Sequence, residues 1–274
     1  MAIIPMNFLD AVVSIGIRKG SSISWIGTGF FVTRRLSDPT KGKPYLVSNK
    51  HVFQSSDKIV IRMREKGTDV LKEMDASLIS NDGSPIFRTH ELEDVDIAVL
   101  PLNPKVISEN HLDFPYFDID EQSMTSNELR DNGVDEGALI YMLGYPMGLV
   151  NKGSNLPICR LGCIARMSET QLREQHNILV DIQNFPGNSG SPIVLRPELM
   201  SIKGTKAQSR SVLVGIIHSY IPYRENLINS QTGQVVEIKS ENSGIANVHP
   251  VEYIRDIIDT IQPRAIAKSS GKRS

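Results

Sequence analysis

Short apolar segments, many of them alternating with polar residues and separated by turn residues, run through most of this 274-residue chain. Segments of this kind are typical of β-strands. Helical periods do not alternate with them, which argues against a parallel α/β sheet. The sequence therefore predicts an all-β fold, with strands at residues 12–17, 27–33, 45–48, 58–63, 76–80, 96–101, 138–144, 158–167, 178–181, 192–195, 212–218 and 244–248.

A serine set between glycines is the segment that most clearly suggests chemistry. Ser189 follows Gly187 by two residues and directly precedes Gly190, and a strand-like apolar segment comes next. Glycine permits tight or left-handed backbone, so such a turn can present the serine hydroxyl outward. The backbone N–H groups of Gly187 and Ser189 could then point at one spot and form an oxyanion hole. Alone the pattern is weak, because most such sequences are ordinary turns.

A histidine and an acid upstream give the serine its context. His51 comes just after the apolar segment 45–48, and Asp96 stands at the head of the apolar segment 97–100. The order His51, Asp96, Ser189 is that of the Ser-His-Asp triad in double β-barrel proteases. The order of an α/β-hydrolase, with the serine first, is not met, which argues against an esterase. Asp94 is a rival acid on the same strand face, and periodicity cannot separate the two.

Five short motifs occur in a fixed order, at residues 27–32, 48–52, 96–100, 144–146 and 187–192. With them the chain resembles the chymotrypsin-fold serine proteases, in particular bacterial trypsin-like peptidase domains related to the high-temperature-requirement proteases. The resemblance covers about residues 12–261 and implies two antiparallel β-barrels with a C-terminal α-helix. It also selects Asp96 over Asp94. Ser191 departs from the pattern, since many relatives carry a second glycine there. Because the sequence lacks a mature Ile-Val-Gly-Gly start, we do not expect activation by N-terminal cleavage, and we expect no appended PDZ domain.

The resemblance also organises the chain. It predicts an N-terminal barrel over residues 1–115 with His51 and Asp96, and a C-terminal barrel over residues 136–248 with Ser189, so that the site lies in the cleft between them. Apolar residues at helical spacing near the end of the chain predict an amphipathic helix that packs on the second barrel. The remaining parts are the interbarrel connection 116–135, surface loops at 196–210 and 224–243, the helix at 249–262 and a disordered basic tail at 263–274.

The matching residues imply a serine endopeptidase that forms an acyl-enzyme. His51 would take the proton of Ser189 as the hydroxyl attacks a substrate carbonyl, and Asp96 would fix the tautomer of His51. The amides of Gly187 and Ser189 would bind the oxyanion. The alternative is a latent or inactive peptide-binding module that a partner switches on, since loops that complete a site can order on binding.

Four residues are candidates for the substrate pocket. In the trypsin subgroup, the residue six positions before the serine forms the floor of the pocket. Here that residue is Gln183, and because it is not an acid it predicts a neutral or small apolar P1 residue. His218, Ser219 and Tyr220 belong to the strand that lines the pocket and pairs with the substrate backbone in the family. For His218, backbone pairing near the cleft is favoured over selection of glutamine, because the motif puts the glutamine-selecting histidine at Ile217.

Composition excludes several functions. The net charge of −1 gives no reason to expect a nucleic-acid or membrane partner, and no apolar segment is long enough to span a membrane. Cys159 and Cys163 supply only half a zinc site, so we expect reduced, buried or half-buried thiols and neither a metal nor an organic cofactor. The poor match to a signal peptide favours a cytoplasmic bacterial protein. The expected partner is a protein or peptide substrate, with control by an activating partner or by homo-oligomers compatible with the sequence.

Overall fold

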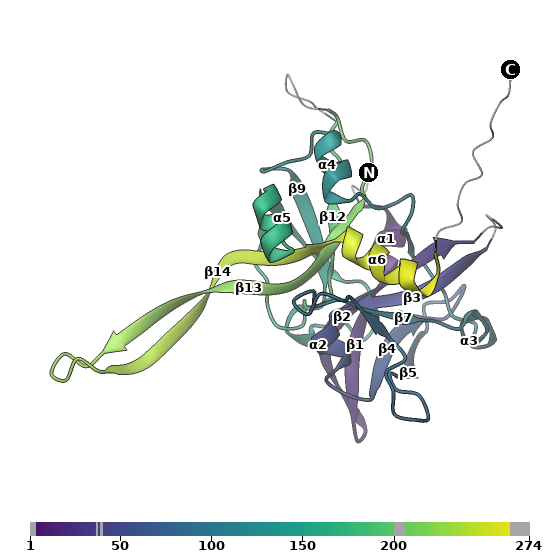
Figure 1. Ribbon diagram of the computed structural model, residues 1–274. Coiled ribbons are helices and arrows are strands. Elements are labelled where there is room, and N and C mark those ends of the chain that lie inside the picture. Colours follow the sequence, from purple (N-terminus) through teal and green to yellow (C-terminus); the bar gives the residue numbers. More distant parts are fainter. Residues whose placement is uncertain (1–3, 37, 39–40, 200–205, 264–274) are drawn as a thin grey trace, which may run out of the picture.

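The computed structural model describes residues 4–36, 38, 41–199 and 206–263, and its strands form two sheets (Figure 1). The first sheet has eight strands in the described part of the chain. Along the order β5-β4-β1-β2-β3-β7-β6 neighbours are antiparallel, and β8 pairs in parallel with β2. The strands are β1 (Val12–Lys19), β2 (Ser22–Arg35), β3 (Gly42–Ser48), β4 (Lys58–Arg64), β5 (Leu71–Ser77), β6 (Arg88–Thr89), β7 (Ala98–Pro101) and β8 (Phe117–Asp118).

The second sheet is a closed antiparallel barrel in the order β10-β11-β14-β13-β12-β9. Its strands are β9 (Leu139–Gly144), β10 (Ile158–Arg166), β11 (Ile178–Asp181), β12 (Pro192–Leu195), β13 (Leu213–Ile228) and β14 (Val235–Pro250). A C-terminal helix, α6 (Val251–Ile261), follows β14 directly. The predicted all-β, double-barrel fold with a terminal helix is therefore confirmed. Every expected strand overlaps an observed one, and only the two-residue strands β6 and β8 were not predicted.

The central strands of the first sheet are apolar on both faces because both faces are buried. Successive side chains of a strand point to opposite sides. Phe31 and Leu46 pack inside the first sheet, together with Phe53 from the short helix α2 (Lys50–Phe53). Their neighbours Phe30 and Val47 face the other way, into a core shared with the second barrel. This explains why the strands read as nearly continuous apolar segments.

The sequence predicted that the C-terminal helix packs on the second barrel. In the structure, helix α6 packs in the core that both halves share. Its buried side chains Ile254 and Ile258 belong to one cluster with Tyr45 and Ile97 of the first half and Leu213 of the barrel. The apolar spacing correctly predicted an amphipathic helix, but spacing cannot show which surface covers it. The helix therefore connects the two halves of the molecule.

A long β-hairpin stands where the sequence suggested a surface loop at 224–243. The strands β13 and β14 continue far beyond the barrel and project from the body as an arm (Figure 1). Tyr223 pairs with Glu241 and Glu225 with Lys239, and Gly233, at φ 67°, closes the tip. The polar composition misled the prediction, because an arm exposed on both faces has no apolar alternation to reveal it.

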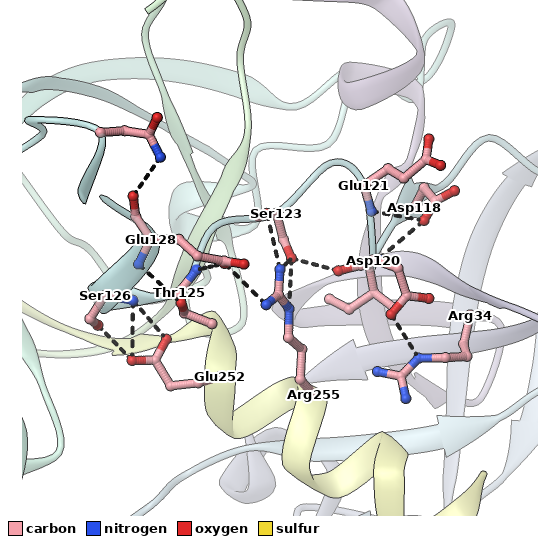
Figure 2. A network of polar contacts seen from close by, with 12 residues as sticks. Arg34, Asp118, Asp120, Glu121, Ser123, Thr125, Ser126, Glu128, Glu252 and Arg255 are labelled. Atoms are coloured by element: carbon pink, nitrogen blue, oxygen red, sulfur yellow. Dashed lines mark hydrogen bonds and ion pairs between the residues drawn. The ribbon is translucent and has the colours of Figure 1, made fainter. Parts of the chain in front are cut away.

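The interbarrel connection is fixed to α6 by a polar network (Figure 2). The Arg255 guanidinium donates from Nη2 to the carbonyl of Ser123 at 3.0 Å and from Nη1 to Glu128 at 3.1 Å. Glu252 accepts from the hydroxyl of Ser126 at 2.6 Å. Ser126 begins α4 (Ser126–Asp131), and Thr125 caps it.

The other helices are short and were not predicted: α1 (Met6–Asp10), α3 (Pro104–Glu109) and α5 (Glu169–Gln175), with a 3₁₀ turn at Pro146–Gly148. Each is too brief to show a helical period. The expected basic tail, 263–274, lies outside the described residues except for Pro263, and the expected loop 196–210 is described only in part.

Candidate active site

The imidazole of His51 is held by Asp96. His51 lies on α2, and its Nδ1 is 2.6 Å from Asp96 Oδ2, while its backbone N–H donates to Asp96 Oδ1 at 3.0 Å. An ionised carboxylate can only accept, so Nδ1 carries a proton, and in the neutral imidazole Nε2 is then the nitrogen with the lone pair. Burial of Asp96 opposes its ionisation, but hydrogen bonds and charge from His51 outweigh burial and lower the pKa of the carboxyl.

The backbone of Asp96 is fixed on both sides. Its carbonyl accepts from Asn49 Nδ2 at 2.7 Å, and its N–H donates to Nε2 of His249 at 3.0 Å. The rival acid, Asp94, points elsewhere, with its Oδ2 2.5 Å from Nδ1 of His176. The fold thus separates two carboxylates that periodicity could not, and it places Asp96 against His51.

Two left-handed glycines shape the turn around Ser189. Gly187 has φ 94° and Gly190 has φ 88°, a region that other residues enter only with strain. The turn also presses against neighbouring backbone. A Cβ on Gly187 would lie 2.5 Å from the carbonyl oxygen of Tyr145, and a Cβ on Gly190 would lie 2.0 Å from that of Thr28. Both glycines are therefore required by conformation and by space.

The turn leaves two amides without partners. The N–H of Asn188 donates to Phe185, that of Gly190 to Ile217, and that of Ser191 to Asn188. Within the described part of the chain, the N–H groups of Gly187 and Ser189 make no hydrogen bond. Buried backbone donors are normally paired, and here the two free donors alternate with paired ones, as an anion site between Gly187 and Ser189 would require.

Thr28, on β2, ties this turn to the first sheet. Its hydroxyl donates to the carbonyl of Gly187 at 2.8 Å and accepts from the N–H of Tyr145 at 3.1 Å. Its own N–H donates to the carbonyl of Ser189 at 2.8 Å, and its carbonyl accepts from the hydroxyl of Ser48 at 2.7 Å. Thr28 has no exposed surface. The hydroxyl, the N–H and the carbonyl of this one buried threonine thus make four hydrogen bonds.

Helix α2 and the serine turn meet at Gly27. A Cβ on Gly27 would lie 2.9 Å from the side chain of Val52, next to His51, and 3.3 Å from the carbonyl oxygen of Ser189. Gly27 therefore lies between the helix that carries His51 and the turn that carries Ser189. Among the described residues Ser189 Oγ makes no hydrogen bond to His51, and such contacts often tighten only when substrate binds.

The four pocket candidates are more scattered. Gln183 is exposed and its side chain extends toward Gly244, where a Cβ would lie 3.7 Å from Gln183 Nε2. Ser219 accepts from Nδ2 of Asn247 at 3.0 Å, and Tyr220 is exposed on β13. The His218 ring stacks on the ring of His249.

Sequence reasoning missed two residues next to the triad. Thr28 lies in the Gly-Thr-Gly motif, which was noticed, but the motif does not show what its hydroxyl reaches. His249 precedes a proline and a helix and carries no pattern of its own. Its contact with Asp96 spans 153 residues and exists only in the folded chain.

The described residues include no group of three or more His, Cys, Asp or Glu side chains placed to hold a metal ion. Both cysteines are free thiols, and Cys159 is exposed, whereas a buried or half-buried residue was expected. An exposed β10 side chain faces water on the outside of the barrel, which spacing alone did not show. No described helix combines the length and the apolar character needed to cross a membrane.

The chain was compared with known proteins. The family model described as trypsin-like peptidase domain matches residues 27–197. Among solved structures, the chain is similar to the MamO protease domain from Magnetospirillum magneticum in its apo form, at 14% sequence identity and a TM-score of 0.46, over 91% of this chain and 96% of that chain. A comparison with curated proteins gave no match.

Proposed function

Because the chain belongs to the trypsin-like peptidase domain family, we propose that it is a serine endopeptidase that uses Ser189, His51 and Asp96 to hydrolyse peptide bonds. The observation that carries the proposal is the 2.6 Å contact between His51 Nδ1 and Asp96 Oδ2. It commits the Nδ1 proton to the acid and leaves Nε2 as a base on the side of the ring away from Asp96. Protein or peptide substrates follow from the family.

In the proposed reaction, His51 Nε2 takes the proton of Ser189 Oγ while the oxygen attacks the substrate carbonyl. The ionised Asp96 stabilises the imidazolium that forms. The free N–H groups of Gly187 and Ser189 receive the developing oxyanion, and each such donor contributes about 3 kcal/mol in measured cases. His51 then gives the proton to the leaving amine, and water repeats the steps on the acyl-enzyme.

We also propose a neutral or small apolar P1 preference. Gln183 offers an amide and no charge, so nothing at that position would pair with an arginine or lysine. The test is cleavage of a mixed peptide library by the wild type and by Ser189→Ala, with products identified by mass spectrometry. Products that appear only with the wild type and end in neutral residues support the proposal. Dominant cleavage after basic residues would overturn the proposed P1 preference. Identical product sets from both proteins would overturn the proposed endopeptidase activity.

A further inference from the structure

Five of the six histidines of the chain belong to one group of contacting side chains around Asp96 and Tyr253, although only His51 belongs to the proposed triad. Tyr253 of α6 makes edge contacts with three of these rings, at centroid distances of 5.1–6.2 Å. Burial disfavours the charged imidazole, and each buried ring nitrogen needs a hydrogen-bond partner. The protonation and the partners of these rings therefore decide what the cluster can do. The cluster consists of His51, His90, His176, His218 and His249.

The tautomer of His249 is fixed by two partners that leave no choice. Its Nε2 faces the backbone N–H of Asp96 at 3.0 Å, and that group can only donate, so Nε2 accepts. Its Nδ1 lies 2.8 Å from the carbonyl oxygen of His176, which can only accept, so Nδ1 carries the proton. The ring has no exposed surface. A buried, neutral His249 therefore satisfies both contacts.

His218 covers the face of His249. The two rings stack with centroids 3.9 Å apart and planes 7° apart, and Nε2 of His218 lies 2.9 Å from Oδ1 of Asn177. Two charged imidazoles could not stack in this way. Burial, and then the neighbouring His249, lower the pKa of His218 to about 3, and burial lowers the pKa of His249. The titratable groups that face the pair are Asp94, Asp96, His51 and His176.

We propose that His249 is a positioning residue for the catalytic acid: as a neutral acceptor of the Asp96 N–H, and braced by the stacked His218, it sets the angle at which Asp96 meets His51. The inference rests on the proposed function and assigns a role to two histidines outside the triad. The Asp96 carbonyl is held from the α2 side by Asn49, and among the described residues the N–H on the other side donates to His249 alone. Without that acceptor the Asp96 N–H loses its partner, and the peptide group before Asp96 loses a contact that sets its orientation and that of the carboxylate.

Two substitutions of His249 each keep one of its two hydrogen bonds and remove the other. In His249→Gln, the amide oxygen reaches the place of Nε2 and can still accept from Asp96. In His249→Asn, the shorter amide reaches only the place of Nδ1, so the contact with His176 survives and the Asp96 N–H loses its partner. His111→Asn is the matched control, because His111 lies outside the cluster with φ 52°, a conformation that asparagine tolerates.

Two readouts are used on the full chain. The first is the rate of Ser189 modification by a fluorophosphonate over a range of probe concentrations. We expect His249→Asn to lower the maximal rate about 10- to 100-fold with half-saturation unchanged, since small misplacements of catalytic groups cost rate at this scale. His249→Gln should stay within about threefold of the wild type, as should His111→Asn.

The second readout is the low-field proton resonance of the Nδ1–H group that His51 shares with Asp96, which needs no catalysis. It should persist in His249→Gln and shift or broaden in His249→Asn. A wild type that fails to react but keeps the resonance would overturn the proposed function while the resonance still tests the positioning role. If His249→Asn does not fold, His218→Ala, which removes the stacked ring and its contact with Asn177 but keeps His249, should show the same loss in weaker form. Wild-type rates and resonance in a folded His249→Asn or His218→Ala would overturn the inference.

Discussion

Replacing Thr28 by valine removes one buried hydroxyl with almost no change of shape. That hydroxyl donates to the carbonyl of Gly187 at 2.8 Å and accepts from the N–H of Tyr145 at 3.1 Å. Both partners would be left unpaired in the interior, and a buried polar group without a partner costs about 1–3 kcal/mol. We therefore expect Thr28→Val to lower the free energy of unfolding by about 3 kcal/mol.

The same change should disturb the proposed oxyanion hole. Gly187 supplies one of the two free amides, and Thr28 is the contact that holds the Gly187 carbonyl on the opposite side of the residue. Loss of one oxyanion donor reduces catalysis by about 10²–10³-fold in measured cases. Modification of Ser189 by a fluorophosphonate should therefore slow by about that factor in Thr28→Val.

The assays are thermal unfolding and the rate of fluorophosphonate modification. A loss of 3 kcal/mol corresponds to a fall of about 6–12 °C in the midpoint for a chain of this size. Thr28→Ser keeps the hydroxyl and should keep both properties. Thr33→Val is the matched control, since Thr33 lies buried on the same strand and its hydroxyl makes no hydrogen bond among the described residues. A Thr28→Val protein that behaves like Thr33→Val would refute the reasoning.

Four further outcomes are expected. Asp96→Asn should slow Ser189 modification by about 10⁴-fold, as the same change does in a measured triad, whereas Asp94→Asn, at the acid paired with His176, should have little effect. Because folding lowers the pKa of Asp96, its ionised form contributes stability above the unfolded pKa of about 4, and this contribution is lost as the pH falls through the folded value. Acid titration of unfolding should therefore cost the wild type more stability than Asp96→Asn. Ser191→Ala should raise the free energy of unfolding in urea by about 1 kcal/mol, since the hydroxyl is buried without a described partner. Replacing residues 224–240 of the arm by Asn-Gly should move the thermal midpoint by less than about 2 °C, because all of those residues are exposed.

The fold was predictable because its strands follow a simple physical rule. Segments such as 27–33 and 45–48 are apolar on both faces, since one face packs inside the first sheet and the other in the shared core. Left-handed glycines at Gly187 and Gly190 were also visible as a pattern, because few other residues adopt their φ. Local requirements of this kind can be read from a sequence.

Contacts between distant segments could not be read in that way. The sequence places Asp94 and Asp96 on one strand face, and only the packing of His176 and His51 against them gives each a different partner. The arm was mistaken for a loop because strands exposed on both sides need no apolar alternation. His249 gave no signal, since its partner lies 153 residues away.

The most direct test of the proposed peptidase is whether Ser189 is a nucleophile in the isolated protein. The wild type and Ser189→Ala are treated with a fluorophosphonate, and the modified residue is identified by mass spectrometry. The proposed mechanism predicts a single adduct on Ser189 that is absent from the mutant, because His51 and Asp96 activate that hydroxyl alone. The proposed mechanism would be contradicted if the folded wild type formed no adduct, or if the wild type and Ser189→Ala were modified to the same extent.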